Sequence, residues 1–158
     1  MTQHDFTLRR ARTQDAQDLT TIITASGLFS PAEAEGFGDN LPDMLSGDDA
    51  TWFRLDHGTL IAGAAYLTRD GINEDVFNLL FIAVAGAFRG RGGGAALISA
   101  AEDAAKADGG RLLLIGRSDG AEQSRARAVY RAAGYVQQGK IADYYAAGLA
   151  KVIFAKAL

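Results

Sequence analysis

A glycine-rich stretch, Arg89-Gly90-Arg91-Gly92-Gly93-Gly94-Ala95, has the residue types of an anion-binding site. It follows an apolar run that predicts a buried strand and opens a predicted helix, where main-chain N–H groups have no helical partner and the helix dipole is positive. Glycine carries no Cβ, so a large anion can approach the main chain directly. Arg89 and Arg91 add positive charge. The stretch therefore predicts a site for a diphosphate.

Three interpretations of this stretch compete. A plain turn between strand and helix is disfavoured, because glycine is about 1 kcal/mol worse than alanine inside a helix and Gly92 to Gly94 occupy the helix start. A dinucleotide fingerprint fits as Gly90-x-Gly92-x-x-Ala95, with Asp119 as the ribose-binding acid. Residues 96–158 are too few, however, for the rest of such a fold and a substrate domain. A Walker loop is excluded, because no Gly-Lys-Ser/Thr is present. The third interpretation is coenzyme A.

Two motifs support coenzyme A through a resemblance to a known family. Arg89-x-x-Gly92-x-Gly94 resembles the Arg/Gln-x-x-Gly-x-Gly/Ala signature of the GNAT family of N-acetyltransferases, and residues 80–84 resemble that family's fourth strand. Residues 126–135 are similar to its Asn-x-x-Ala-x-x-Phe/Leu-Tyr-x-x-x-Gly-Phe motif. The opening, residues 8–15, also resembles the family, so the resemblance covers essentially the whole chain.

The resemblance implies an α/β fold of mixed α+β type, with a central, twisted, mixed sheet of about seven strands flanked by about four helices. It also implies acetyl-CoA as cosubstrate, with no metal. The residues that it places at acetyl-CoA are Ile82, Ala83, Val84, Arg89, Gly90, Arg91, Gly92, Gly93, Gly94, Ala95, Gln123, Ala126 and Tyr130. Gln123 stands where the family often has asparagine, which weakens the implied contact to pantetheine.

Acetyl transfer to an amine needs particular groups. An alkyl ammonium with a pKa of ~10.4 must lose a proton before it attacks the thioester, and the resulting oxyanion needs an N–H donor. The resemblance gives the donor role to the amide of Ile82 or Val84. It also makes Tyr130, with an ordinary pKa of ~10, the proton donor to the departing thiolate, whose thiol has a pKa of ~8.5. The alternative for Tyr130 is an aromatic residue that packs its helix on the sheet.

The general base stays open. The family's glutamate would align with Asn78, an amide that cannot accept a proton, although it could hold a water molecule that passes the proton on. Asn78 is therefore a candidate catalytic residue. The other candidates, each also compatible with a solvated carboxylate, are Glu35, Glu74, Asp75 and Asp143. His57 lies in a predicted hairpin turn, where we expect it to be exposed.

Hydrophobic periodicity and turn residues predict one domain over residues 1–158. Strands are expected over residues 6–10, 51–56, 59–68, 76–85, 111–115, 135–138 and 151–156, with a loop over 139–150. A first helix is expected to begin after Thr13 and to end near Ser26-Gly27. Further helices are expected over residues 32–37, 95–107 and 121–133, with irregular chain after residue 37. The strand–helix–strand order around the glycines predicts a parallel crossover. Tyr144 and Tyr145 in the expected loop either border the acceptor site or anchor the loop or a dimer.

Composition narrows the class of protein. The 158 residues include no cysteine and two histidines, which excludes a disulfide framework and a thiolate metal site and disfavours a histidine metal site. A net charge of −3 gives no global argument for nucleic acid. No apolar run is long enough for a bilayer and the N-terminus does not resemble a signal peptide, so we expect a cytoplasmic protein without a membrane partner. A homodimer, which relatives often form, is compatible with the sequence.

The sequence thus predicts an N-acetyltransferase that acts on an amine of a small molecule or peptide, by direct attack through a tetrahedral intermediate. The alternative is a non-catalytic module that binds coenzyme A in a regulatory role. Asn78 in place of the usual acid favours the module, and the presence of Tyr130 favours the enzyme.

Overall fold

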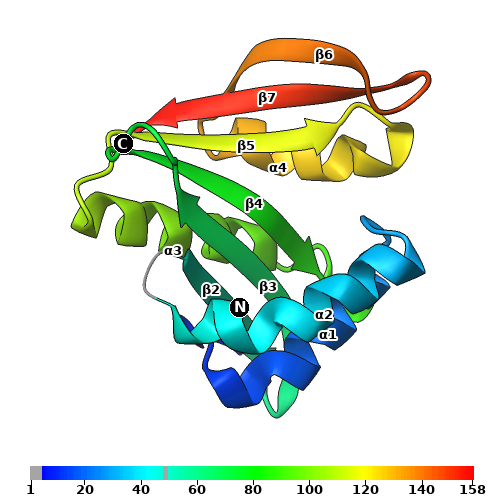
Figure 1. The fold of residues 1–158 in the computed structure, drawn as a ribbon, viewed down its shortest axis with the longest axis vertical. Coiled ribbons are helices and arrows are strands. Elements are labelled where there is room, and N and C mark those ends of the chain that lie inside the picture. Colours follow the sequence, from blue (N-terminus) through cyan, green and yellow to red (C-terminus); the bar gives the residue numbers. More distant parts are fainter. Residues whose placement is uncertain (1–4, 48–49) are drawn as a thin grey trace.

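A seven-stranded sheet runs through the molecule. Figure 1 shows the fold of the computed structural model, which describes residues 5–47 and 50–158. The strand order is β1-β2-β3-β4-β5-β7-β6, and every neighbouring pair is antiparallel except β4 and β5. The strands are β1 (Phe6–Arg10), β2 (Ala50–His57), β3 (Leu60–Arg69), β4 (Val76–Val84), β5 (Leu112–Ser118), β6 (Val136–Ala146) and β7 (Leu149–Ala157). The mixed sheet and the parallel crossover are as predicted.

Four α-helices cover the two faces of this sheet. Within the described residues these are α1 (Ala16–Ala25), α2 (Pro31–Ser46), α3 (Gly93–Ala107) and α4 (Ser124–Ala132), with short 3₁₀ turns at Thr13–Asp15, Gly86–Phe88 and Ala121–Gln123. One apolar core lies under α3 and α4, and a second lies under α1 and α2. Each helix presents an apolar stripe to one of these cores, which is what holds the layers together. The expected class of fold is confirmed.

An extra residue in β4 changes the direction of its side chains. Tyr66 of β3 faces Phe81, but the next residue, Leu67, faces Leu79, so Leu80 is left over as a β-bulge. Phe81 consequently joins the core under α1 and α2, whereas Ile82 joins the core under α3. The bulge therefore sets which atoms of the last residues of β4 face the site described below.

The parallel strands β4 and β5 are paired over only part of their length. Their aligned pairs run from Val76–Leu112 to Leu79–Ile115 and stop there. Figure 1 shows the two strands close together at one end and apart at their carboxyl ends. The end of β4 therefore has an edge that β5 does not cover.

Two expectations about the helix and loop boundaries were wrong. The helix expected over residues 32–37 is the sixteen-residue α2, which continues through Pro42. Ser30 and Glu33 form a reciprocal capping box at its start, with Ser30 N–H donating to Glu33 at 2.7 Å. Gly38 lets α2 approach α1, because a Cβ there would lie 3.1 Å from Thr20. Tertiary packing therefore outweighs the helix-breaking composition.

The loop expected over residues 139–150 is instead most of a long hairpin between β6 and β7. The register between these strands shifts between Ile141 and Ala146, where Asp143 adopts a positive φ of 55°. The Asp143 carboxylate accepts a hydrogen bond from Gly148 N–H at 2.7 Å, which closes the hairpin turn. Tyr144 and Tyr145 thus lie on a strand and not in a free loop.

Candidate active site

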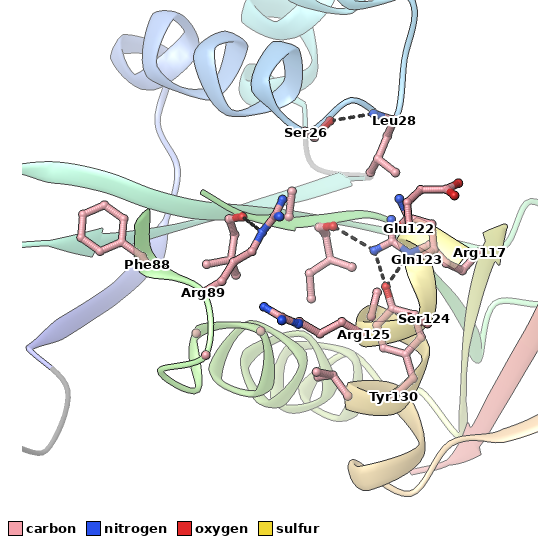
Figure 2. Close-up of a pocket in the computed structure, with 18 of the residues that line it drawn as sticks. Ser26, Leu28, Phe88, Arg89, Arg117, Glu122, Gln123, Ser124, Arg125 and Tyr130 are labelled. Carbon is pink, nitrogen blue, oxygen red and sulfur yellow. Dashed lines mark hydrogen bonds between the residues drawn. The ribbon is translucent and has the colours of Figure 1, made fainter. Parts of the chain in front are cut away.

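A cavity of about 550 Å³ opens where β4 and β5 separate. Its walls come from the end of β4, the glycine-rich loop before α3, the start of α4, Arg117 of β5 and the loop between α1 and α2. Figure 2 shows these walls, with Arg125 next to α3, Arg89 alongside the strands, and Ser26 and Leu28 on the side opposite α3. Segments distant in the sequence thus enclose one space that is large enough for part of an extended ligand.

The glycine-rich loop directs main-chain N–H groups at the start of α3. Gly90 and Gly92 have φ values of 75° and 84°, which L side chains rarely adopt. The first hydrogen bond of α3 runs from Ala96 N–H to Gly92 C=O, so the preceding N–H groups of the first turn have no helical acceptor. At Gly93 a Cβ would lie 2.8 Å from the buried side chain of Leu55, so glycine lets the loop lie tightly on β2. The structure therefore supports the predicted anion site, which the helix dipole favours as well.

The last residues of β4 offer main-chain groups to the same cavity. Ala85 N–H donates to Ala62 of β3, so the alternate residues Ile82 and Val84 direct their main-chain groups away from β3, toward the edge that β5 leaves uncovered. Ile82 C=O accepts a hydrogen bond from Arg117 at 2.9 Å, and Val84 C=O accepts one from Arg89 at 3.2 Å. The N–H groups of Ile82 and Val84 face the same edge and are available to a ligand oxygen.

Tyr130 of α4 reaches the cavity from the opposite wall. Its ring is 1% exposed and packs edge-to-face on Phe154 with 5.7 Å between centroids. Its hydroxyl accepts hydrogen bonds from Arg117 Nε at 2.8 Å and from Arg117 Nη2. Burial raises the pKa of Tyr130, and the charge and hydrogen bonds of Arg117 partly oppose that rise. The phenol is therefore neutral near pH 7, as a proton donor must be.

Most of the predicted site residues come together here. Those that line the cavity are Ile82, Ala83, Val84, Arg89, Gly90, Gly92, Gly93, Gly94, Gln123, Ala126 and Tyr130. Arg91 and Ala95 do not line it; Arg91 lies over the Phe88 ring, 5.9 Å from its centroid. Asn78 is also outside the cavity, in the paired part of β4 between Thr68 and Leu114, and it interacts with Asp70. A role for Asn78 stays a prediction that its position does not favour.

The predicted candidates for the base are likewise outside the cavity. Asp75 forms an ion pair with Arg111 at 2.6 Å, Asp143 caps the β6–β7 turn, and Glu35 and Glu74 are exposed elsewhere. His57, expected to be exposed, is half-buried at the end of β2, where its ring lies 5.0 Å from that of Phe88. None of these groups faces the uncovered edge of β4.

Sequence reasoning missed three charged residues of the cavity. Arg125 and Glu122 flank Gln123 at the start of α4, and Arg117 comes from the end of β5. Among the described residues that line the cavity, Glu122 is the one carboxylate, and no described cation forms an ion pair with it. The signal for Arg117 was a lone arginine two residues after a run of apolar residues that predicts a buried strand.

Tyr145 lies near these charged residues. Burial and the neighbouring Tyr144 raise its pKa, whereas the charge of Arg117 lowers it. Tyr144 contacts the Tyr145 ring with 4.9 Å between centroids, and Lys151 lies 4.6 Å from the Tyr144 ring. Tyr145 therefore borders the region beside Arg117, while Tyr144 packs with β7.

Within the described residues, no helix is long and apolar enough to cross a bilayer, and no group of three or more acidic or histidine side chains is arranged to hold a metal ion. The charged side chains that line the cavity, among the residues that the structure describes, are three arginines and one glutamate. Such a set, together with main-chain N–H groups, favours a ligand that carries phosphates.

Comparisons with known proteins agree with this chemistry. The model of the acetyltransferase (GNAT) family matches residues 17–135. A GNAT-family protein from Desulfovibrio desulfuricans superposes with a TM-score of 0.87 at 25% identity, over 96% of this chain and 98% of that one. No protein of curated function matches the sequence significantly.

Two further solved structures contain coenzyme A or acetyl-CoA. PaiA N-acetyltransferase from Thermoplasma acidophilum, in complex with coenzyme A, has a TM-score of 0.77 at 16% identity, over 97% of this chain and 99% of that one. YncA from Salmonella typhimurium, with its cofactor acetyl-CoA, has a TM-score of 0.75 at 14% identity, over 97% of this chain and 94% of that one. At these identities the likeness establishes a shared fold.

Proposed function

The chain belongs to the GNAT family of acetyltransferases, and on that premise we propose that it transfers the acetyl group of acetyl-CoA to an amine of a small molecule or peptide. The observation that carries this proposal is one cavity that joins three features: the N–H groups at the start of α3, the uncovered edge of β4 and the Tyr130 hydroxyl. These are the groups that a diphosphate, a thioester carbonyl and a departing thiolate need.

The cosubstrate is assigned to the side of the cavity formed by α3 and α4. The loop Arg89–Gly94 would hold the diphosphate, and Arg125, which Figure 2 shows pointing into the cavity, would add a positive charge. The thioester would then lie along the edge of β4, where the N–H of Ile82 or Val84 stabilises the oxyanion of the tetrahedral intermediate. Tyr130 would protonate the thiolate.

The amine is assigned to the opposite side, near Ser26 and Leu28 of the α1–α2 loop. Glu122 is our candidate for the group that accepts the amine's proton, because among the described cavity residues it is the one carboxylate. Its carboxylate is exposed, so it can exchange the proton with solvent. In this proposal Glu122 takes the place of the glutamate that the family often carries where this chain has Asn78.

Release of free thiol from acetyl-CoA, measured against a panel of amines and peptides, tests the proposed function. Acetylation should be confirmed by mass spectrometry of the acceptor. Tight binding of coenzyme A with no turnover on any amine would instead indicate the non-catalytic module.

A further inference from the structure

Arg117 is a nearly buried cation at the end of β5. It is 8% exposed, and no carboxylate among the described residues forms an ion pair with it. Arg54, which is also 8% exposed, shows the usual arrangement: it pairs with Asp15, Asp18 and Asp56 at 2.5 to 3.0 Å. Removing a charge from water without a partner is costly, so the unpaired state of Arg117 calls for an explanation.

Its hydrogen bonds show what Arg117 organises. Nη2 donates to Ile82 C=O on β4, and Nε and Nη2 both donate to the Tyr130 hydroxyl on α4. The remaining nitrogen, Nη1, has no described hydrogen-bond partner and is not sealed off from the cavity that Arg117 lines. One guanidinium therefore connects the two walls of the cavity and still offers a donor to a ligand.

The same bonds orient the Tyr130 proton. A phenol oxygen can accept about two hydrogen bonds and can donate one. Because the two donors of Arg117 occupy the accepting side of the oxygen, and no described group accepts the Tyr130 proton, the O–H is left to point at whatever occupies the cavity. Figure 2 shows Arg117 and the Tyr130 hydroxyl joined in this way.

We propose that Arg117 is the positioning residue for the leaving-group step, since it aims the Tyr130 hydroxyl at the CoA sulfur and stabilises the negative charge that forms there and then moves to the phenol oxygen. This inference rests on the proposed acetyl transfer. The missing counter-charge is then the transient thiolate or phenolate, which is present only during the reaction.

The step balances without any further reactant. When the tetrahedral intermediate collapses, the C–S bond breaks, its electron pair goes to sulfur, and sulfur takes the Tyr130 proton. The phenolate that remains is hydrogen-bonded to the Arg117 guanidinium. Glu122 has taken the first proton of the ammonium before attack, and the phenolate regains its proton from the second, which the nitrogen loses as the amide forms. Arg117 keeps its own protons throughout. Among the described residues, the other titratable groups that line the cavity are Glu122, Arg89 and Arg125, and Tyr145 lies beside Arg117.

The pKa of the CoA thiol, measured in the complex by the ultraviolet absorbance of the thiolate, tests this inference directly. In the wild-type protein Arg117 should hold that pKa below the value that the same measurement gives for free coenzyme A. Arg117→Gln, which can still donate to Ile82 C=O, should return it toward the free value. Arg117→Lys keeps the charge but loses the planar guanidinium that donates two hydrogen bonds to the Tyr130 hydroxyl, so it should give an intermediate pKa. It serves as the second variant if Arg117→Gln folds poorly.

Turnover provides the second readout. Arg117→Gln should lower kcat by about tenfold to a hundredfold, which corresponds to the loss of one hydrogen bond to a charged group, with little change in the KM for acetyl-CoA. Arg127→Met is the matched control, because Arg127 also braces the end of β5, through bonds to Ser118 C=O and Gly120 C=O at 2.8 Å, but does not line the cavity and donates no hydrogen bond to Tyr130. It should lower the melting temperature and leave the thiol pKa unchanged.

A folded Arg117→Gln protein that binds coenzyme A with an unchanged thiol pKa and an unchanged kcat would overturn the inference, and Arg117 would then be only a structural brace. That failure differs from failure of the proposed function. In the first case the wild-type protein still acetylates an amine, and in the second it acetylates none.

Discussion

Leu79 of β4 and Ile115 of β5 form the last aligned pair between the two parallel strands. Beyond this pair β4 keeps its partner β3 but loses β5, so its main-chain N–H and C=O groups have no strand to bond with on that side. Arg117, two residues after Ile115, enters the gap and satisfies Ile82 C=O. The end of strand pairing is therefore what creates the proposed site for a thioester.

The glycine at the N-cap of α3 tests the placement of the diphosphate. We expect Gly92→Glu to abolish acetyl-CoA binding, because the new carboxylate adds bulk and repels the phosphates. Gly109→Glu is the matched control: its φ of 82° is close to the 84° of Gly92, so both variants carry a similar strain of about 1 to 2 kcal/mol, but Gly109 lies at the other end of α3. Calorimetry should find normal binding in the control, and equal affinities in the two variants would refute the placement.

The Tyr130 hydroxyl tests the proton donor. Tyr130→Phe keeps the ring on Phe154 but removes the proton, so kcat should fall by about a hundredfold while the KM for acetyl-CoA changes little. Tyr135→Phe is the control, since it removes another buried hydroxyl, which bonds to Glu102 at 3.0 Å and lies away from the cavity. Its turnover should be normal and its stability lower. Full activity of Tyr130→Phe across the pH range would remove Tyr130 from the mechanism.

Glu122 tests the proposed base. Glu122→Gln keeps the shape of the side chain but cannot take a proton, so kcat/KM for the amine should fall by about a hundredfold near pH 7. The loss should shrink as the pH rises toward ~10, where the amine is neutral without help. Glu74→Gln, outside the cavity, should behave as wild type. A pH-independent loss in Glu122→Gln would instead indicate a binding role.

The buried ion cluster around Asp15 predicts the stability at low pH. The hydrogen bond from Arg9, and to a lesser extent other partners including Arg54, holds the pKa of Asp15 well below its ordinary value despite burial. A carboxylate whose folded pKa is depressed contributes stability above its unfolded pKa of ~3.9, and this is lost as the pH falls toward the folded value. Urea unfolding of Asp15→Asn should therefore show about 3 kcal/mol less stability at pH 7 and a smaller loss in acid.

The exposed pair of Asp75 and Arg111 is the control for that experiment. Both side chains are about half exposed, so Asp75→Asn should cost less than about 1 kcal/mol at any pH. If Asp15→Asn were as stable as Asp75→Asn, the cluster would not anchor α1 to β2 as the structure indicates.

The class of fold and the anion loop could be predicted because local sequence determines them. Glycines with positive φ at 90 and 92 and the apolar run of β4 are properties of short segments. The bulge at Leu80 could not be predicted, because the run is apolar at nearly every position and shows no alternation that a shift would interrupt. Because the bulge could not be foreseen, the direction of the Ile82 and Val84 main-chain groups could be predicted only from the resemblance.

The charged residues of the site were harder to predict than its glycines. Arg117 lies thirteen positions before Tyr130 in the sequence, and the two side chains meet only because the end of β5 lies beside α4. Arg117 therefore becomes a candidate site residue only in the folded structure. The tertiary structure also decides α2: its glycines and Pro42 predicted irregular chain, but the capping box of Ser30 and Glu33 begins the helix and contact with α1 extends it. These features depend on contacts across the fold that no single segment encodes.

A crystal structure of the protein with bound coenzyme A tests the central claim most directly. We expect the diphosphate on the N–H groups between Arg89 and Ala95, and the sulfur between the edge of β4 at Ile82 and the Tyr130 hydroxyl. A complex in which the diphosphate lies elsewhere, or in which the sulfur points away from both of these groups, would contradict the account.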